Sequence, residues 1–226
     1  MVNLADPVAV GHSVEGRALS ACHFGAAAPT VLFLGGVHGD EPEGIRFAEA
    51  LIAQWRTHGV PSGVRVCGLP VVNPDGAHAS QRVNAHGVDL NRNMPTKDWS
   101  PVAASVRYHP GPAPASEPET RALMACVEQL QPILIVSLHS WDPMINVNGP
   151  CGEVARVLAK TSGYRIADDI GYPTPGSLGT WAGAERQIPT ITMELERGAA
   201  HEQLWSLHAQ GFCDLLEHVA AGKSLG

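Results

Sequence analysis

The sequence predicts one α/β domain over residues 1–226, built on a mixed, largely parallel and twisted sheet with helices on both of its faces. Short apolar runs rich in β-branched residues, typical of buried strands, recur along the chain. Stretches with helical spacing lie between these runs, which is the order of strands joined by crossover helices. The length of 226 residues suits a single domain with a substantial core, and no linker or internal repeat divides it.

The individual elements follow from the same patterns. The predicted strands are residues 31–36, 65–73 (one or two strands), 133–139 and 190–196. The predicted helices are residues 42–58, 116–130, 150–162 and 199–221. Pro42 suits a first helical turn, and Ser116 and Glu119 have the spacing of a capping box. Residues 74–115 lack periodicity, and a long loop of this kind is usually functional or disordered.

The charge balance and the cysteines limit the classes of function. The 15 Lys and Arg residues against 22 Asp and Glu residues give a net charge of −7, so we expect neither a nucleic acid nor a membrane as partner. The longest apolar run, residues 133–138, is too short to cross a bilayer. Five cysteines without a C-x-x-C pair indicate reduced thiols, and the first residues show no signal peptide. We therefore expect a cytoplasmic protein, whose oligomeric state the sequence does not indicate.

Three potential metal ligands lie at or just after the ends of predicted strands: His38, Glu41 and His139. Because ligands of α/β sheets bind beyond the carboxyl ends of the strands, we expect these side chains to share a site. Two imidazoles and one carboxylate leave a fourth coordination position open, which is the pattern of a catalytic site with one zinc ion (Zn2+). The H-x-x-E spacing alone is also typical of a loop turn with a capping carboxylate.

Glu194 lies within the apolar, β-branched run 190–196. An unpaired charge there costs on the order of several kcal/mol, so we expect a partner or a raised pKa. A glutamate beside a metal site is a natural general base. Glu196 points to the same face of the strand and remains an alternative, as does a salt bridge at the end of the sheet.

The stretch 84–93 gathers several polar residues in the predicted loop. Arg92 offers a planar fork for a carboxylate, and Asn91 adds donors beside it. Asp89 could accept the second N–H of a metal-bound histidine, and Arg82 could stabilise an oxyanion. A solvated turn is the alternative for any single member of this set.

Five motifs resemble, in order and spacing, those of the zinc carboxypeptidase family. They are HGDE (38–41), NPDG (73–76), GVDLNRN (87–93), SLHS (137–140) and ITMEL (191–195). The resemblance covers about residues 30–215 and implies a zinc-dependent hydrolase that cleaves an amide bond next to a free carboxylate. It implies that His38, Glu41 and His139 bind the zinc and that Glu194 is the general base.

The resemblance also assigns roles to the substrate contacts. Arg82 would stabilise the oxyanion, Asn91 and Arg92 would bind the terminal carboxylate, and Asp89 would orient a zinc-bound histidine. Tyr172, 22 residues before the predicted general base, is similar in position to a mobile tyrosine that covers the substrate. A half-buried loop aromatic is the alternative for this residue.

The stretches 83–99, 116–120 and 171–181 are similar to a bacterial branch of the family, the murein peptide amidases. This implies a small murein peptide as substrate, cleaved between γ-D-glutamate and meso-diaminopimelate during cell-wall recycling. Residues 100–115 and 140–151 depart from that branch, and both could line the specificity pocket.

Diaminopimelate has an amine and a carboxylate at its far end, so its pocket needs one acidic partner and one cationic or amide partner. Asp142 and Asn146 are candidates for the amine end, and each also suits a turn. One alternative function is an N-acyl amino acid deacylase of the succinylglutamate desuccinylase or aspartoacylase type, although NPDG and TPGSLGTW favour the peptidase branch. The other is a non-catalytic protein that binds zinc or a peptide.

Overall fold

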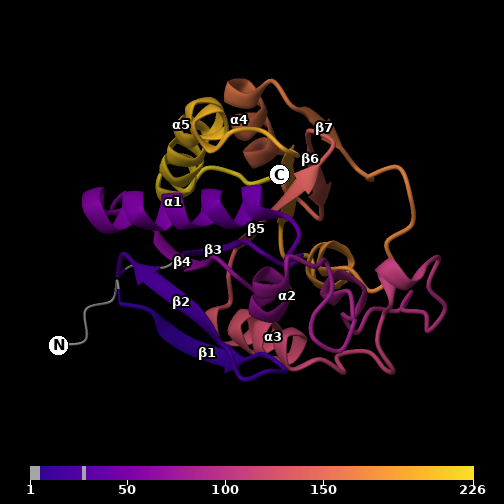
Figure 1. The fold of residues 1–226 in the computed structure, drawn as a ribbon. Helices are drawn as coiled ribbons and strands as arrows, with labels where there is room; N and C mark the ends of the chain where they lie inside the picture. Colours follow the sequence, from indigo (N-terminus) through magenta and orange to yellow (C-terminus); the bar gives the residue numbers. More distant parts are fainter. Residues whose placement is uncertain (1–5, 27–28) are drawn as a thin grey trace.

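A single eight-stranded sheet runs through the computed structural model, which describes residues 6–26 and 29–226 (Figure 1). The strands are β1 (Val8–His12), β2 (Ala18–Phe24), β3 (Thr30–Leu34), β4 (Arg65–Leu69), β5 (Leu134–Trp141), β6 (Met144–Asn148), β7 (Arg165–Ala167) and β8 (Thr190–Glu196). Their order across the sheet is β1-β2-β4-β3-β5-β8-β6-β7. The four central strands, β4, β3, β5 and β8, are parallel to one another.

Antiparallel pairing is confined to the flanks of this parallel centre. The β1–β2 hairpin joins β4 antiparallel at one side, and β6 joins β8 antiparallel at the other. The sheet is therefore mixed, as the sequence predicts.

Helices cover both faces of the sheet (Figure 1). They are α1 (Pro42–His58), α2 (Pro74–Ala79), α3 (Pro118–Leu130), α4 (Gly152–Ser162) and α5 (His201–Ala220). Phe47 of α1, Leu158 of α4 and Phe212 of α5 belong to the core on one face. Leu123 of α3 and Trp181, from a short π-helical segment (Gly179–Ala184), belong to the core on the other. The predicted α/β class with helices on both faces is confirmed.

The strand β3 shows why the central strands read as continuous apolar runs. Its five residues are all buried. Val31 and Phe33 pack into the core beneath α1, whereas Leu32 and Leu34 pack into the core beneath α3. Successive side chains of a strand point to opposite faces, so a strand covered on both sides needs apolar residues at every position.

Two local predictions need correction. Of residues 65–73, only Arg65–Leu69 form a strand, and the NPDG stretch then caps and begins the short helix α2. Asn73 caps this helix, because its side chain accepts a hydrogen bond from the backbone N–H of Gly76 at 2.9 Å. The predicted capping box is absent, because α3 begins at Pro118 and its N-cap residue makes no side-chain cap. Ser116 instead donates its hydroxyl to Glu117 at 2.7 Å.

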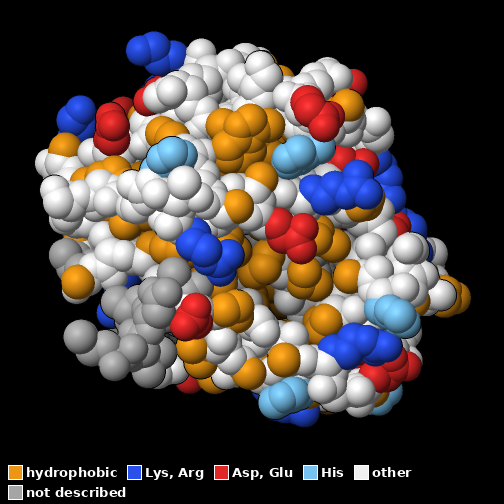
Figure 2. Space-filling view, turned by 60° about the vertical axis from the view of Figure 1, so that its left-hand side comes forward, with side chains coloured by type: hydrophobic (Ala, Val, Ile, Leu, Met, Phe, Trp, Pro, Cys, Tyr) orange, Lys and Arg blue, Asp and Glu red, His pale blue; other side chains and the backbone are white. Residues whose placement is uncertain are grey.

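The surface agrees with the modest net charge. On the face shown in Figure 2, Lys and Arg side chains are scattered among acidic and apolar ones. Within the described residues, none of the helices combines the length and the apolar character needed to cross a membrane.

Candidate active site

The three predicted metal ligands converge at the carboxyl ends of the central strands β3 and β5. His38 Nδ1 lies 2.9 Å from Glu41 Oε1, and His139 Nδ1 lies 2.9 Å from Glu41 Oε2. The two histidine Nδ1 atoms are 3.0 Å apart. All three side chains are buried. Among the described residues, these three side chains are the cluster of His, Cys, Asp or Glu whose ligand atoms lie close enough together to hold a metal ion.

The geometry of this group fits zinc. Donor atoms at the corners of a tetrahedron around zinc, with bonds of about 2.0–2.1 Å, lie about 3.3 Å apart. The two Nδ1 atoms are 3.0 Å apart and each lies 2.9 Å from a different oxygen of Glu41, distances close to that value; one ligand atom from each residue lies within 4.8 Å of the others. Although burial opposes ionisation, His38 and His139 hold the pKa of Glu41 well below its usual range. The carboxylate is therefore charged and available as a ligand.

Glycines allow the segments that carry these ligands to come together. His38 and Glu41 follow β3, and α1 begins directly after them. A Cβ atom on Gly39 would lie 2.0 Å from the backbone of Gly76 in α2. A Cβ atom on Gly44, in the first turn of α1, would lie 2.6 Å from the carbonyl oxygen of Leu138 in β5. Because β5 carries His139, the close approach at Gly44 helps to bring the ligands of two segments together.

Asp89 lies behind the metal group and connects it to Arg82. Its Oδ1 atom lies 3.2 Å from His38 Nε2, and its Oδ2 atom accepts a hydrogen bond from Arg82 Nε at 2.9 Å. Asp89 is fully buried, yet the charges of His38, Arg82 and Arg92 outweigh the effect of burial and lower its pKa. The backbone N–H of Asn91, two residues further along the chain, donates to the same Oδ1 atom at 2.9 Å. Asp89 is therefore an ionised carboxylate that can orient both His38 and Arg82.

Glu194 faces the metal group from the adjacent strand. In the parallel β5–β8 pair, Glu194 is the register partner of His139. Its Oε2 atom is buried and has no hydrogen-bond partner within the described residues. Burial, assisted by the nearby Glu41, raises the pKa of Glu194 to about 7 against the opposing effect of His139 and Arg82. Glu196, the alternative considered above, is exposed.

The metal group and Glu194 open onto one cavity. Arg82, Asn91, Arg92 and Tyr172 line it as well. Asn91 is fixed by its Oδ1 atom, which accepts the backbone N–H of Leu178 at 2.8 Å. The structure thus brings these four predicted contacts into the same cavity as the predicted ligands and the predicted base.

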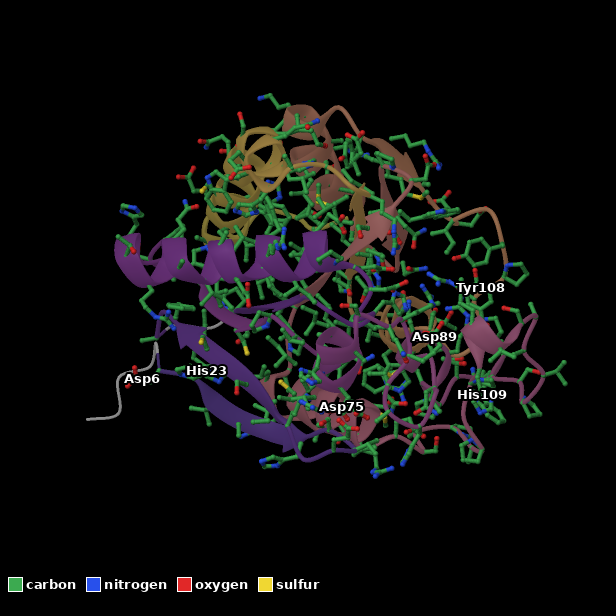
Figure 3. The ribbon with its side chains drawn as sticks, in the orientation of Figure 1. Asp6, His23, Asp75, Asp89, Tyr108 and His109 are labelled. Carbon is green, nitrogen blue, oxygen red and sulfur yellow. The ribbon has the colours of Figure 1, made fainter. Side chains whose placement is uncertain are left out.

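Aromatic rings cover the two inner arginines. The ring of Tyr108 lies 5.2 Å from the Arg82 guanidinium carbon and 5.3 Å from that of Arg92. Tyr108 and Asp89 lie in the same loop region, beyond α2 (Figure 3). Tyr172, which is exposed, packs edge-on against Trp141 with 5.6 Å between ring centroids. These rings form an apolar rim at which Tyr172 could cover a bound substrate.

The two predicted contacts for diaminopimelate lie in different places. Asn146 lines a pocket that adjoins the cavity and shares Asn91, Tyr172 and Glu194 with it. Asp142 is exposed and pairs with Arg165 at 2.9 Å, so the structure does not bring it to either pocket.

Sequence reasoning missed several residues of these pockets. Asp168 and Asp169 line the adjoining pocket, and Arg107 and Arg197 line the main cavity. They belong to no motif and to no segment with periodicity, so no signal in the sequence pointed to them.

This combination of fold and site belongs to a known class of protein. The sequence pattern of the zinc carboxypeptidase family matches residues 2–155. The chain belongs to that family and is a zinc-dependent hydrolase, as the five motifs predicted.

Individual relatives narrow the comparison. The chain is 34% identical to murein peptide amidase A of Vibrio campbellii, over 95% of this chain and 89% of the relative. It is 36% identical to murein peptide amidase A of Escherichia coli K12, over 72% of this chain and 69% of the relative. The crystal structure of a murein-tripeptide amidase from Escherichia coli O157 is similar with a TM-score of 0.77 and 30% identity, covering 93% of this chain and 91% of that one.

Proposed function

We propose that this protein hydrolyses the amide bond between γ-D-glutamate and meso-diaminopimelate in small murein peptides. The observation that supports this most directly is the position of Glu194, unpartnered and buried, opposite the His38–Glu41–His139 group in a cavity lined by arginines. The two curated relatives named murein peptide amidase A, and the solved murein-tripeptide amidase, support this choice of substrate.

His38, Glu41 and His139 would hold the zinc ion. When bound, zinc supplies a Lewis acid that makes a water molecule more acidic and polarises the amide carbonyl. Glu194 would accept a proton from the attacking water, since its carboxylate has no competing hydrogen bond to that oxygen within the described residues. The same carboxyl group would then give the proton to the departing amine.

The neighbouring cations and amides would position the substrate. Arg82, held by Asp89, would donate N–H groups to the oxyanion that develops on the carbonyl oxygen. Arg92 and Asn91 would bind the free carboxylate beside the scissile bond. Tyr172 would cover the substrate, and Asn146 would contact the far end of diaminopimelate in the adjoining pocket.

We place this reaction in the cytoplasm, as a step in the recycling of cell-wall peptides. The five cysteines are free, which suits a reducing compartment.

Mass spectrometry of the products from purified L-Ala-γ-D-Glu-meso-diaminopimelate tests the proposal. We expect free diaminopimelate and the dipeptide L-Ala-D-Glu, formed without chelator and suppressed with it. N-succinyl and N-acetyl amino acids serve as comparison substrates. Faster release of their acyl groups than of diaminopimelate would favour a deacylase instead.

A further inference from the structure

The active-site cavity contains two arginines for which the proposed reaction has no role. Arg107 comes from a short 3₁₀ helix (Val106–Tyr108), and Arg197 directly follows β8. Both line the cavity together with Arg82 and Arg92. Four arginines therefore line a cavity whose lining acidic residues are Glu41 and Glu194, and such a cluster of guanidinium groups suits a substrate with more than one carboxylate.

A single carboxylate holds the two additional arginines side by side. Arg107 Nη2 donates to Asp40 Oδ2 at 3.0 Å, and Arg197 Nη2 donates to the same oxygen at 3.3 Å. Arg197 Nη2 also donates to the backbone oxygen of Asp40 at 2.7 Å. Two guanidinium groups, which stay protonated in proteins, thus share one carboxylate as acceptor, and Glu43, which accepts the backbone N–H of Gly198 at 2.8 Å, is a second negative charge close to Arg197.

Both guanidinium groups remain accessible to a ligand. The side chains of Arg107 and Arg197 are 48% and 41% exposed. Each guanidinium has five N–H donors, and the hydrogen bonds found among the described residues use only part of them. Their shared partner Asp40 fixes their spacing before a ligand arrives, which lowers the entropic cost of binding an anion.

This arginine pair and the adjoining pocket lie on different sides of the metal group. Arg197 reaches back across the sheet to Asp40, which follows β3, and its Nη1 lies 3.4 Å from the backbone oxygen of Ser140 in β5. The adjoining pocket instead includes Asn146 of β6. Since the strand order is β3-β5-β8-β6, the pair lies on the β3 side and the pocket on the β6 side.

We propose that Arg107 and Arg197 bind a second carboxylate of the substrate, carried by its acyl part. The inference rests on the proposed function, in which Arg92 and Asn91 bind the carboxylate of the departing amine. A γ-linked glutamyl group keeps its α-carboxylate free, whereas an α-linked residue has an amide at that position. The arginine pair therefore selects acyl groups that carry a free carboxylate, and so favours a γ-glutamyl group over an α-linked residue with an uncharged side chain.

Two substrates that differ only in this carboxylate test the inference. The first is L-Ala-γ-D-Glu-meso-diaminopimelate, and the second replaces D-glutamate by 4-aminobutyrate. For the unmodified protein, we expect kcat/KM to be about 10- to 100-fold higher for the first substrate, which corresponds to one or two charge-assisted hydrogen bonds. For Arg197→Gln and Arg107→Gln, we expect the ratio of kcat/KM between the first and the second substrate to fall towards one. The fall should come mainly from a lower kcat/KM for the first substrate.

The design separates binding of the carboxylate from a structural role. Loss of a merely structural contact would lower kcat/KM for both substrates by the same factor, and this result would overturn the inference. Arg156→Gln is the matched control, because Arg156 is an exposed arginine of α4 that pairs with Glu153 and lines neither the cavity nor the adjoining pocket. This variant should keep the full preference. Equal cleavage of both substrates by the unmodified protein would overturn the inference alone. Cleavage of neither would overturn the proposed function and the inference with it.

Discussion

Glu194 is buried without a hydrogen-bond partner for one carboxylate oxygen, which is an unfavourable environment for a charge. A stable fold retains such a group at a cost in stability, and the raised pKa of about 7 expresses that cost. Its position opposite the predicted metal ligands gives a chemical reason for the cost, because a poorly solvated carboxylate is a stronger base than an exposed one.

Replacing Glu194 with Gln should therefore remove catalysis and leave the metal site intact. Gln has nearly the same shape but cannot accept a proton, so we expect kcat to fall by about 10²- to 10⁴-fold. Zinc content, measured on the purified variant by atomic absorption, should remain near one ion per chain. The control is Glu196→Gln, which changes an exposed carboxylate on the same strand and should keep its activity. A Glu194→Gln variant with near-normal kcat would exclude Glu194 as the base.

Asp89 supports two functional side chains at once, so its replacement should affect metal binding as well as turnover. In Asp89→Asn the side chain loses its negative charge and keeps only one acceptor oxygen. It can therefore no longer accept hydrogen bonds from both His38 Nε2 and Arg82 Nε through separate oxygens. We expect zinc affinity, measured by competition with a chelating dye, to fall by about 10- to 100-fold. Unchanged affinity would mean that the histidine is oriented by other contacts.

Residues within motifs could be predicted from the sequence, and residues outside them could not. His38, Glu41 and His139 stand at strand ends with distinctive neighbours, so their types and positions were informative. Arg107 and Arg197 reach the cavity only because their loops fold over it, and the path of a loop depends on tertiary contacts that no local pattern records.

At the scale of elements, α1 crosses β5 so closely that Gly44 has no space for a side chain. For Gly44→Ala, whose Cβ would lie 2.6 Å from the Leu138 carbonyl oxygen, we expect a loss of about 1–3 kcal/mol in the free energy of unfolding. Zinc affinity should fall with it, because the shift would separate Glu41 from His139. Urea unfolding measures the first effect.

The matched control is Gly152→Ala at the start of α4, where the nearest atom to the new Cβ would be 3.8 Å away. That variant should be as stable as the parent. A Gly44→Ala variant of parental stability would show that the helix can move away from the sheet without cost.

The packing of α5 predicts a dependence of stability on pH. His208 is 1% exposed, lies against Phe47, and places its Nε2 3.2 Å from the hydroxyl of Tyr164. Burial lowers the pKa of His208 from 6.5 to about 4, so the unfolded chain binds a proton at a pH where the folded one does not. This contribution to stability is complete above about pH 6.5 and is lost as the pH falls towards 4.

We therefore expect the free energy of unfolding to fall, through His208 alone, by about 2 kcal/mol between pH 7 and pH 5. In His208→Gln this part of the change should be missing, although the variant is less stable at every pH. Urea titrations at the two pH values give the change in the free energy of unfolding for each protein. The difference between the two changes isolates His208, because the contributions of the carboxylates common to both proteins cancel. Parallel stability curves would show that His208 does not titrate in this way.

Element prediction succeeded where the local pattern and the tertiary environment agree. The four central strands and the four long helices appear close to their predicted bounds, because strands covered on both faces and amphipathic helices have strong periodicity. The β1–β2 hairpin, β6 and β7 were not predicted; β1 and β7 are short and largely exposed, so they carry little apolar signal. Pro118 begins α3 without a side-chain cap, which a search for capping residues alone cannot find.

At the scale of the whole molecule, the predicted metal ligands come from segments that are distant in the chain. His38 and Glu41 follow β3, whereas His139 belongs to β5. His139 lies 101 residues after His38 and 98 residues after Glu41. An ion bound to all three stabilises the folded state relative to the unfolded state by mass action.

Zinc should consequently raise the melting temperature. With free zinc at about 1,000 times its dissociation constant, we expect about 4 kcal/mol of stabilisation and a shift of roughly 10 °C for a chain of this size. Differential scanning calorimetry of the chelator-treated and reloaded protein measures the shift. Glu194→Gln should show the same shift and His139→Ala a much smaller one; equal shifts for both would place the ion elsewhere.

The pairing of His139 with Glu194 in adjacent parallel strands has a consequence for how this scaffold can change over evolutionary time. The backbone ladder fixes the spacing between these two residues, the proposed ligand and the proposed base, so loops can lengthen, shorten or mutate without changing that spacing. Arg107, Arg197 and the two aspartates of the adjoining pocket all stand on such loops or directly beyond a strand. Descendants of this chain could therefore exchange one peptide for another while the hydrolytic step itself is inherited unaltered.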